Sequence, residues 1–455
     1  MRKIQKISDL HPMLGFTEFD IYQDYRQSFQ SSELGKIYEL FPFSDLCKEL
    51  KLQECTLGRD SYFSPQGKIA LMLLKSYTGL SDKDLIAQLN ANLHYQFFCG
   101  VRIHPLNPLT NFKIVSEIRC EIGKQLDIDS LQQILSSAWK PYLENTSVML
   151  TDATCYESFI RFPTDVKILW ESVDWIYRQL KGIVKSLKGR MPRSKYDKQN
   201  RRYHSYCKKR KRKQSETRVL KRSLLHLLHK LIGVLEETIR TNRSRLELRG
   251  QFHKRLSIIK KVLHQQTVRF QGGEVKGLIV SIDKSYIRPI VRGKETKRVE
   301  FGAKVNTIQV DGINFIEHLS FDAFHEGIRI PQCISKHQRL LRKRVTHLSA
   351  DRIYATNDNR KYCSDPARKI TTSFVRKGRA TSDEVQAQQM RNLLNKERST
   401  RLEGSFGTEK QHYSLDKIKA RTKHTEILWI FFGIHTANAV RMIPKVEKGR
   451  EKQAA

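Results

Sequence analysis

The residues most able to do chemistry in this chain are acidic residues at the ends of apolar runs. Asp152 lies near the end of the first apolar run in SVMLTDATCYESFIRF, and Asp351 ends the run in VTHLSADRIYA. Glu403 lies in a later helical segment. Three carboxylates are hard oxygen ligands that suit two Mg²⁺ ions, and such ions about 3.5 to 4 Å apart can drive an in-line phosphoryl displacement. These residue types therefore indicate metal-dependent phosphoryl transfer.

Other aspartates compete for the second position in this set. An aspartate after a strand is more often a solvated loop residue or a cap, so each one alone is weak evidence. Asp311 is followed by Gly312, and Asp-Gly favours a hairpin turn. Asp322 is a further competitor. Asp283 stays a rival on residue patterns alone, because it also ends an apolar run, SID.

The hydrophobic pattern predicts the elements that must position these carboxylates. Apolar residues at spacings of three and four predict short helices over about residues 37–139 and longer ones over 168–268. A strand or hairpin is expected at SVMLTDATCYESFIRF, and a helix over 325–343. Further strands are expected in LIVSIDKSYIRPIV, VEFGAKVNTIQV, INFIEHLSF, VTHLSADRIYA and KITTSFV, followed by helix over 382–439. In such a mixed sheet, the ends of neighbouring strands lie side by side, and a helix packed across them can add a third carboxylate.

A dense basic segment lies between the first strand and the later ones. From Lys181 to Arg218 there are sixteen Lys or Arg residues and only two acidic residues. A phosphate backbone is the usual partner that neutralises such a block, although a solubilising segment is the alternative. Interleaved aromatic residues could offer stacking surfaces to nucleic acid: Tyr196, Tyr203, His204 and Tyr206. We therefore expect DNA contacts from the densest basic run, which consists of Lys208, Lys209, Arg210, Lys211, Arg212 and Lys213.

The composition narrows the class of protein. Lys and Arg number 83 against 47 Asp and Glu, a net charge of +36, which favours a polyanionic partner such as DNA or RNA. The eight cysteines include no C-x-x-C pair, so neither a zinc site nor a secreted disulfide framework is indicated. The longest apolar run, 427–434, is far shorter than the roughly 20 residues that cross a bilayer. We expect a cytoplasmic protein without a membrane anchor.

Several segments, in order, resemble those of bacterial insertion-sequence transposases of the DDE class. The segment FSPQGKIALMLLKSYTGLSDKDLIAQLNANLHYQFFCG resembles the InsH-type helical N-terminal domain of that family. LTDATCYESFIRFPTD resembles the first-aspartate motif, and IRPIVRGK with VEFGAKV resembles the central strands. SADRIYATNDNRKYC resembles the second-aspartate motif, and LEGSFGTEKQHYSLDKIKAR the glutamate helix. The resemblance extends from about residue 13 to residue 441.

The resemblance implies that Asp152, Asp351 and Glu403 are the catalytic metal ligands, so that Asp351 is preferred to Asp283. Lys410 matches the family's lysine seven positions after the glutamate. Lys396 lies seven positions before the glutamate, on the same face of a continuous helix. Both lysines are expected to bind DNA beside the metals, and a solvated stripe is the alternative.

The glutamate helix departs from the family pattern at one position. The family usually has an arginine four residues before the glutamate, where this chain has Ser399. The nearest arginines are Arg398 and Arg401, and neither receives a role from the resemblance. The tyrosine that the family tends to have upstream of that arginine is also missing between residues 382 and 403.

The implied fold is an α/β catalytic core, an RNase H-like mixed sheet flanked by helices, with an all-α N-terminal domain and a helical insertion. The expected divisions are 1–140 for a helical DNA-binding or dimerisation domain, 141–166 and 271–440 for the catalytic core, 167–270 for the basic insertion, and 441–455 for a basic C-terminal tail.

The implied function is that of a DNA transposase that binds the terminal inverted repeats of an insertion sequence and catalyses Mg²⁺-dependent strand cleavage and strand transfer. Mn²⁺ is expected to substitute for Mg²⁺. The expected partners are double-stranded DNA, from the element ends and the target, and a second copy of the chain in a synaptic complex in the bacterial cytoplasm, associated with the nucleoid. Two alternatives stay open: an RNase H-like nuclease with the same triad, which would not join strands, and a non-catalytic DNA-binding remnant of a transposase.

Overall fold

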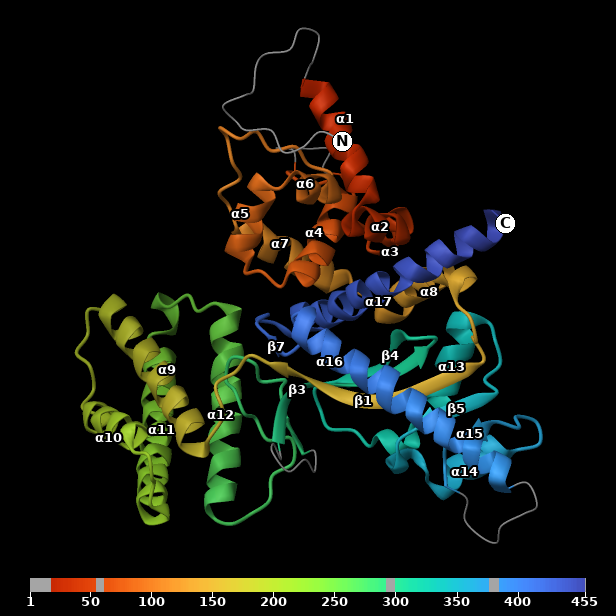
Figure 1. Ribbon diagram of the computed structural model, residues 1–455. Coiled ribbons are helices and arrows are strands. Elements are labelled where there is room, and N and C mark those ends of the chain that lie inside the picture. The colour runs from red at the N-terminus through yellow and green to blue at the C-terminus, as the bar shows by residue number, and fades with distance from the viewer. Residues whose placement is uncertain (1–17, 55–60, 292–298, 376–383, 455) are drawn as a thin grey trace.

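A computed structural model describes residues 18–54, 61–291, 299–375 and 384–454 of the chain. Figure 1 shows an N-terminal group of helices, a curled mixed sheet with helices around it, and a separate group of long helices beside the sheet. The N-terminal helices are α1 (Glu18–Ser31), α2 (Glu33–Leu40), α3 (Phe43–Glu49), α4 (Pro65–Thr78), α5 (Asp82–Ala91), α6 (Leu93–Cys99), α7 (Lys113–Gln125) and α8 (Ile128–Trp139), with a short 3₁₀ turn at Lys140–Tyr142.

Local capping residues set the ends of these helices. Ser64 begins α4 by accepting a hydrogen bond from the amide of Gly67, and Gly79 ends it in the left-handed conformation, with φ of 65°. Ser81 caps α5 in the same way by accepting from the amide of Asp84. The helical N-terminal region expected from the apolar spacing is confirmed.

The mixed sheet contains strands of both orientations. Its members are β1 (Val148–Ser158), β2 (Pro289–Val291), β3 (Val299–Val310), β4 (Ile313–Ser320), β5 (His347–Ala350), β6 (Thr371–Thr372) and β7 (Lys417–Ile418). The strand order is β2-β3-β1-β5-β6, with β4 also paired with β3 and β7 with β1. The pairs β2/β3, β4/β3 and β3/β1 are antiparallel, and β1/β5, β5/β6 and β1/β7 are parallel. This arrangement is consistent with the expected RNase H-like core.

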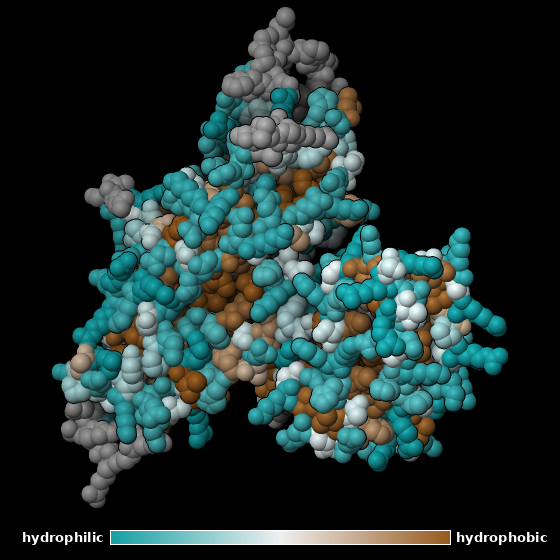
Figure 2. Space-filling view, turned by 180° about the vertical axis from the view of Figure 1, so that it is seen from behind, coloured by the Kyte–Doolittle hydropathy of each residue, from teal (hydrophilic) through white to brown (hydrophobic). Residues whose placement is uncertain are grey.

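The long helices beside the sheet form an insertion between β1 and β2 with a hydrophobic core of its own. They are α9 (Asp165–Ser186), α10 (Tyr196–Lys208), α11 (Gln214–Thr241) and α12 (Gly250–Phe270), with a 3₁₀ turn at Arg243–Arg245. Seen from behind, the insertion is a lobe joined to the rest of the molecule by a narrower junction (Figure 2). The helices expected over 168–268 are confirmed.

The remaining helices surround the sheet. They are α13 (Ile330–Leu341), α14 (Asn357–Ser364), α15 (Glu384–Glu397), α16 (Glu403–His412) and α17 (Lys423–Ala454), with 3₁₀ turns at Glu326–Ile328 (η4) and Arg352–Tyr354 (η5) and a π-helical turn, η6, at Arg398–Leu402.

By length and composition α17 could cross a membrane, yet 72% of its most apolar stretch is buried in the protein. It packs on α2, α4, α7 and β4, as a core helix does, and joins the N-terminal helices to the sheet in one continuous core.

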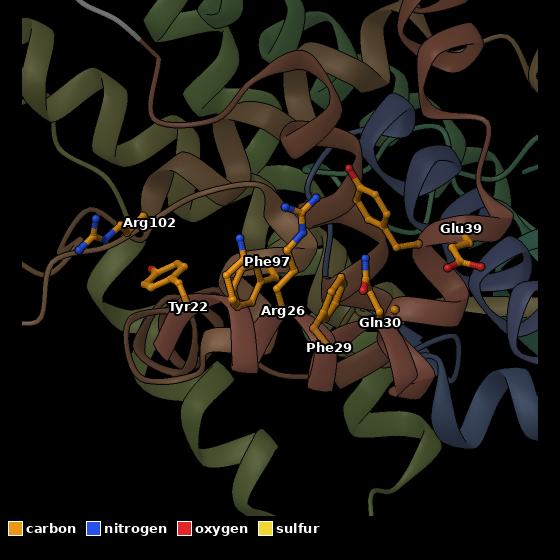
Figure 3. Close-up of a pocket in the computed structure, with 10 residues that line it drawn as sticks. Tyr22, Arg26, Phe29, Gln30, Glu39, Phe97 and Arg102 are labelled. Atoms are coloured by element: carbon orange, nitrogen blue, oxygen red, sulfur yellow. The ribbon is translucent and has the colours of Figure 1, made fainter. Parts of the chain in front are cut away.

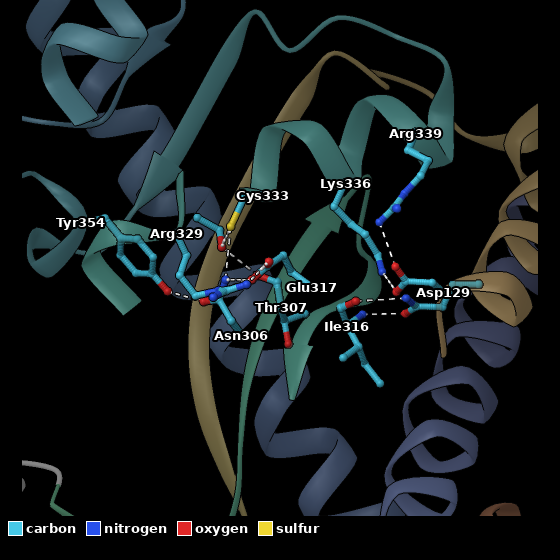
Figure 4. Close-up of polar contacts among 12 residues, drawn as sticks. Asp129, Asn306, Thr307, Ile316, Glu317, Arg329, Cys333, Lys336, Arg339 and Tyr354 are labelled. Carbon is cyan, nitrogen blue, oxygen red and sulfur yellow. Dashed lines mark hydrogen bonds and ion pairs between the residues drawn. The ribbon is translucent and has the colours of Figure 1, made fainter. Parts of the chain in front are cut away.

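Polar contacts also fasten α8 to the edge strand β4 (Figure 4). The side-chain amide of Gln132 donates to the carbonyl of Ile316 (3.0 Å) and accepts from its amide (2.6 Å). Asp129 forms ion pairs with Lys336 and Arg339 of α13. Because an uncovered edge strand invites pairing with another chain, these contacts also protect β4.

Several predicted elements differ from the structure. SVMLTDATCYESFIRF forms one long strand, not a hairpin, and the helix predicted over 382–439 is interrupted after His412, where Ser414 has a φ of 61°. LIVSIDKSYIRPIV is strand only at Pro289–Val291, because Ile279 and Ile282 pack in the insertion core while Val280 and Ile287 pack in the main core. The segment therefore bridges the two cores. KITTSFV keeps only the two residues of β6 as strand.

Other local predictions are confirmed. Asp311 and Gly312 form the turn between β3 and β4, with φ of 47° and 81°, and α13 lies within the predicted range 325–343. An Asp-Gly pair suits this turn because both of its central residues need positive φ.

Candidate active site

One face of β1 packs against the helical segment that carries Glu403. Alternate residues of a strand point to the same side of a sheet, so residues 150, 152, 154 and 156 share a face. Each contacts the segment from η6 to α16: Leu150 packs with Leu402 and Phe406, Asp152 pairs with Arg398, Thr154 accepts from Lys410 and Tyr156 donates to Glu409. The segment therefore lies along β1 in a fixed register.

The two aspartates directly follow a residue pair that joins the parallel strands β1 and β5. Thr151 of β1 is paired with Ala350, the last residue of β5, so Asp152 follows within β1 and Asp351 follows the end of β5. Asp351 begins η5 and accepts a hydrogen bond from the amide of Arg352 (2.7 Å). The end of β5 thus places both carboxylates at one point of the sheet.

The rival aspartate lies elsewhere. Asp283 is exposed and forms an ion pair with Arg255 of α12, in the insertion. The structure therefore does not bring Asp283 to the other carboxylates.

A single guanidinium joins the three predicted carboxylates. Arg398 Nη1 lies 2.7 Å from Asp152 Oδ2 and 2.8 Å from Glu403 Oε1, and Nη2 lies 3.9 Å from Asp351 Oδ1. The Arg398 and Asp152 side chains are only 14% and 17% exposed, whereas those of Asp351 and Glu403 are 52% and 51% exposed. The cluster is therefore closed on the side of the sheet and open toward solvent.

The π-helical turn η6 explains how this arginine reaches the glutamate from a spacing of five. The amide of Glu403 donates to the carbonyl of Arg398, an i to i+5 bond that fits one extra residue into the turn. Arg398 and Glu403 consequently lie one turn apart. The sequence prediction assumed an unbroken α-helix and so left Arg398 without a role, although the one-residue offset from the family spacing was the available signal.

The same turn overturns the argument made for Lys396. That lysine was expected on the face of Glu403 because a continuous α-helix aligns residues seven apart. The π turn between residues 396 and 403 breaks the register, and Lys396 is exposed in α15. Lys410 instead lies against β1, where its Nζ donates to Thr154 Oγ1 at 3.0 Å.

A largely buried polar network joins the turn that follows Asp351 to β3 and β4 (Figure 4). The Tyr354 hydroxyl donates to Asn306 Oδ1 (2.5 Å), and Asn306 lies opposite Ala153 in the β1/β3 pair. Asn306 Nδ2 donates to Glu317 (2.9 Å), which Arg329 binds through two hydrogen bonds of 2.8 and 2.6 Å. Sequence reasoning missed this network because its members are far apart in the chain.

A second buried network fixes α16. Glu409 is fully buried and accepts from the Tyr156 hydroxyl and from Asn314 Nδ2, both at 2.5 Å, while Arg441 Nη1 lies 3.6 Å away. Burial raises the pKa of the Glu409 carboxyl, and the arginine and the hydrogen bonds oppose that rise. The network ties the glutamate helix to β1, β4 and α17 at once.

Burial also dominates the electrostatics of Asp152. It raises the pKa of this carboxyl to about 6, although the Ala153 amide and the Arg398 guanidinium favour the charged form. The negative charges of Asp351 and Glu326 raise the pKa further. Asp152 therefore changes its charge close to neutral pH.

The basic run of the insertion lies apart from the carboxylates. Residues 208–213 are all exposed at the turn from α10 to α11, on the side of the insertion away from the sheet (Figure 1). Within it, Lys209 pairs with Glu216 (2.7 Å) and Arg212 lies over the Tyr206 ring.

The aromatic residues near this run serve mainly the insertion's own core. Tyr196 stacks on Tyr177, Tyr203 stacks on Trp170, and Tyr206 is buried. Tyr206 is therefore not available for stacking with nucleic acid, whereas Tyr196 and Tyr203 are only partly buried and their expected contact with nucleic acid stays a prediction.

A large pocket lies in the N-terminal helices (Figure 3). Its volume is about 730 Å³, and its lining includes Tyr22, Arg26, Phe97 and Arg102. Its only acidic lining residue among those described is Glu39. Because phosphoryl transfer with metals needs several carboxylates, the chemistry is better placed at the cluster around Arg398.

The donor set of that cluster suits a hard cation. Its three carboxylates offer only oxygen, which Mg²⁺ and Mn²⁺ prefer. Across the described part of the chain, however, no three His, Cys, Asp or Glu side chains are already gathered as a metal cage. The carboxylates meet at the guanidinium instead.

Comparison with known families gives two matches. Residues 22–120, from α1 into α7, match a transposase domain (DUF772), and residues 348–435, from β5 into α17, match a transposase DDE domain. Asp351 and Glu403 lie within the second match, whereas Asp152 lies outside both. Searches of curated proteins and of solved structures found no match.

The Glu409 network predicts a large loss of stability on truncation. Glu409→Ala should lower the free energy of unfolding by about 3 to 5 kcal/mol, because it leaves the buried Tyr156 and Asn314 and the partly buried Arg441 without their partner. Urea unfolding of the purified protein measures this. Glu397→Ala, which removes a carboxylate in a surface pair with Arg401 (2.8 Å), should change stability by less than about 1 kcal/mol. Equal losses of stability from the two substitutions would show that the buried contacts of Glu409 do not stabilise the fold.

The raised pKa of Asp152 predicts how stability depends on pH in the absence of metal. A folded pKa of about 6 exceeds the ordinary value of 3.8, so the folded state binds this proton more tightly than the unfolded state. The resulting stabilisation is complete below about pH 3.8 and is lost as pH rises to about 6. In EDTA, the melting temperature of the wild type relative to Asp152→Asn should therefore fall between pH 4 and 6 and stay level above. A difference in melting temperature that stays constant from pH 4 to 6 would contradict the raised pKa of Asp152.

Proposed function

Because this chain belongs to the DDE transposases of insertion sequences, we propose that it binds the terminal inverted repeats of its element and catalyses Mg²⁺-dependent strand cleavage and strand transfer. The observation that carries the proposal is the convergence of Asp152, Asp351 and Glu403 on one cation, Arg398. Carboxylates that surround one positive charge are also suited to divalent ions.

The three carboxylates would hold the metal. DDE transposases generally use divalent ions, and we assign two Mg²⁺, replaceable by Mn²⁺, to Asp152, Asp351 and Glu403. When bound, such ions activate the attacking oxygen and stabilise the leaving oxygen of the displacement. The rigid contacts of β1, η5 and α16 hold the carboxylates in position, so that little rearrangement is needed during the reaction.

The two reactions are the same displacement with different nucleophiles. In cleavage, a water oxygen bonds to phosphorus at the element end while the bond to the 3′ oxygen breaks, and the 3′ oxygen leaves as a hydroxyl. In strand transfer, that 3′ hydroxyl attacks a phosphorus of the target strand and displaces its 3′ oxygen. A single site can therefore serve both steps. Lys410, whose Nζ donates to Thr154 two residues from Asp152, would bind a DNA phosphate beside the reacting one.

Other surfaces would hold the DNA and the partner copy. We assign DNA contact to Lys208, Lys209, Arg210, Lys211, Arg212 and Lys213 and to Lys396, all of which are exposed. Residues 1–140 would serve DNA binding or dimerisation, 141–166 and 271–440 catalysis, and 167–270 the basic insertion, which has its own core. A homodimer is proposed because two element ends must be held together for transposition.

Removing one charge from the triad should abolish the chemistry and spare DNA binding. Asp152→Asn, Asp351→Asn and Glu403→Gln keep the side-chain shapes and should lower Mg²⁺-dependent end cleavage by about a thousandfold or more, because each weakens metal-assisted charge stabilisation. The measurement is cleavage of a DNA fragment that carries the element end, beside a gel-shift assay of binding.

Asp283→Asn is the matched control for the triad. It makes the same change at an exposed aspartate that pairs with Arg255, so cleavage should stay near the wild-type rate. Normal cleavage by Glu403→Gln would show that the site is wrongly assigned. With a supercoiled plasmid as target, the wild type should yield joined products, whereas cleavage without joining would favour a nuclease.

The basic run predicts a change in the salt dependence of DNA binding. Replacing residues 208–213 with Gln should weaken binding to all sequences, and the slope of log K against log salt should fall by about 0.9 for each DNA phosphate that the protein no longer neutralises. Lys448→Gln with Lys452→Gln, which removes exposed charges paired with Glu144, should leave the slope unchanged. An unchanged slope in the 208–213 variant would mean that this run is only a solubilising segment.

A further inference from the structure

Arg398 occupies the position where the three carboxylates converge. They come from three separate elements, β1, the end of β5 and the start of α16, and like charges brought this close repel one another. The guanidinium is a flat fork of five N–H donors, which suits it to bridging several carboxylates. Its side chain is only 14% exposed, so it is built into the cluster and does not lie over it.

The guanidinium is not completely satisfied in this position. Its Nε is buried and has no hydrogen-bond partner among the residues that the structure describes. A buried donor without a partner costs free energy, so the position is less favourable for arginine than the two short ion pairs alone suggest. The cluster therefore holds the guanidinium at a cost.

The backbone at Arg398 is also unlike that of an ordinary helix. The π turn carries the exposed residues Ser399 and Thr400, whose hydroxyls donate to the carbonyl of Lys396 at 3.1 and 2.7 Å. The same turn carries Arg401, which pairs with Glu397 and lies 3.9 Å from Asp311, away from the triad. The turn therefore directs one arginine into the cluster and the other out of it.

We propose that Arg398 is an internal counter-ion that occupies the metal position of the metal-free enzyme and must leave that position when divalent ions bind. The inference rests on the proposed function, because it takes the three carboxylates as metal ligands. In this account the guanidinium offsets carboxylate repulsion during folding and then competes with the incoming ion. The half-exposed carboxylates of Asp351 and Glu403 leave a solvent-facing side through which the exchange can occur.

The direction of a change in metal affinity separates this role from a purely structural one. If Arg398 competes with metal, Arg398→Gln should bind Mn²⁺ more tightly, by about tenfold, the effect of one charge-assisted hydrogen-bond pair. If Arg398 only aligned the carboxylates as ligands, its loss would loosen the cluster and weaken binding.

The experiment is a Mn²⁺ titration of the full-length protein without DNA, followed by the electron paramagnetic resonance signal of free Mn²⁺. Arg401→Gln is the matched control, since it removes the same charge from the same turn without touching the triad, and its affinity should equal that of the wild type. Arg398→Lys keeps a cation but loses the fork, so its affinity should lie between wild type and Arg398→Gln. It also supplies the direction of the effect should Arg398→Gln not fold.

Thermal unfolding gives a second readout. In EDTA, Arg398→Gln should melt below the wild type, because the carboxylates lose their counter-ion, and saturating Mn²⁺ should raise its melting temperature more than that of the wild type. Unchanged or weaker Mn²⁺ affinity in Arg398→Gln, with binding still abolished by Asp152→Asn, would overturn this inference and leave the proposed function standing. Binding that survives Asp152→Asn would instead overturn the metal site on which the proposed function rests.

Discussion

The repulsion among three carboxylates is the constraint on which this structure depends. Asp152, Asp351 and Glu403 come from distant parts of the chain, and each loses part of its hydration where they meet. One guanidinium, that of Arg398, contacts all of them, at 2.7 to 3.9 Å. Paired charges with reduced access to water interact more strongly than exposed pairs, yet the cost of their desolvation must be offset by neighbouring contacts. Much of the surrounding fold supplies those contacts.

The supporting contacts are buried polar networks that act on different elements. Tyr354 and Asn306 attach the turn after Asp351 to β3, and Glu409 attaches the helix of Glu403 to β1 through Tyr156. The centre of each network is buried, at Asn306 and at Glu409, where an unpaired group would be costly, so its geometry admits few alternatives. The carboxylates are thereby held on strand ends and a helix, elements that position side chains more sharply than loops do.

The sequence was sufficient for the parts that follow from local pattern. β-Branched and aromatic runs predicted β1 and β5, and the positions of Asp152 and Asp351 within them are adjacent once the parallel pairing is formed. The sequence was insufficient for features of the fold that tertiary packing determines. The π turn at Arg398 follows no propensity rule, and nothing local shows that Tyr203 and Tyr196 stack on Trp170 and Tyr177 inside the insertion. The segment at 278–288 was predicted as strand because its apolar residues, divided between two cores, mimic a strand pattern.

We propose that the position held by Arg398 in the metal-free protein is the metal site of a DDE transposase. Crystals of the full-length protein grown with Mn²⁺, measured at a wavelength where manganese scatters anomalously, test this claim most directly. An anomalous peak is expected within about 2.0 to 2.3 Å of oxygens from Asp152, Asp351 and Glu403, with the Arg398 guanidinium moved out of the cluster. A protein crystallised with saturating Mn²⁺ in which Arg398 still bridges the three carboxylates, and the only manganese peaks lie elsewhere, would contradict it.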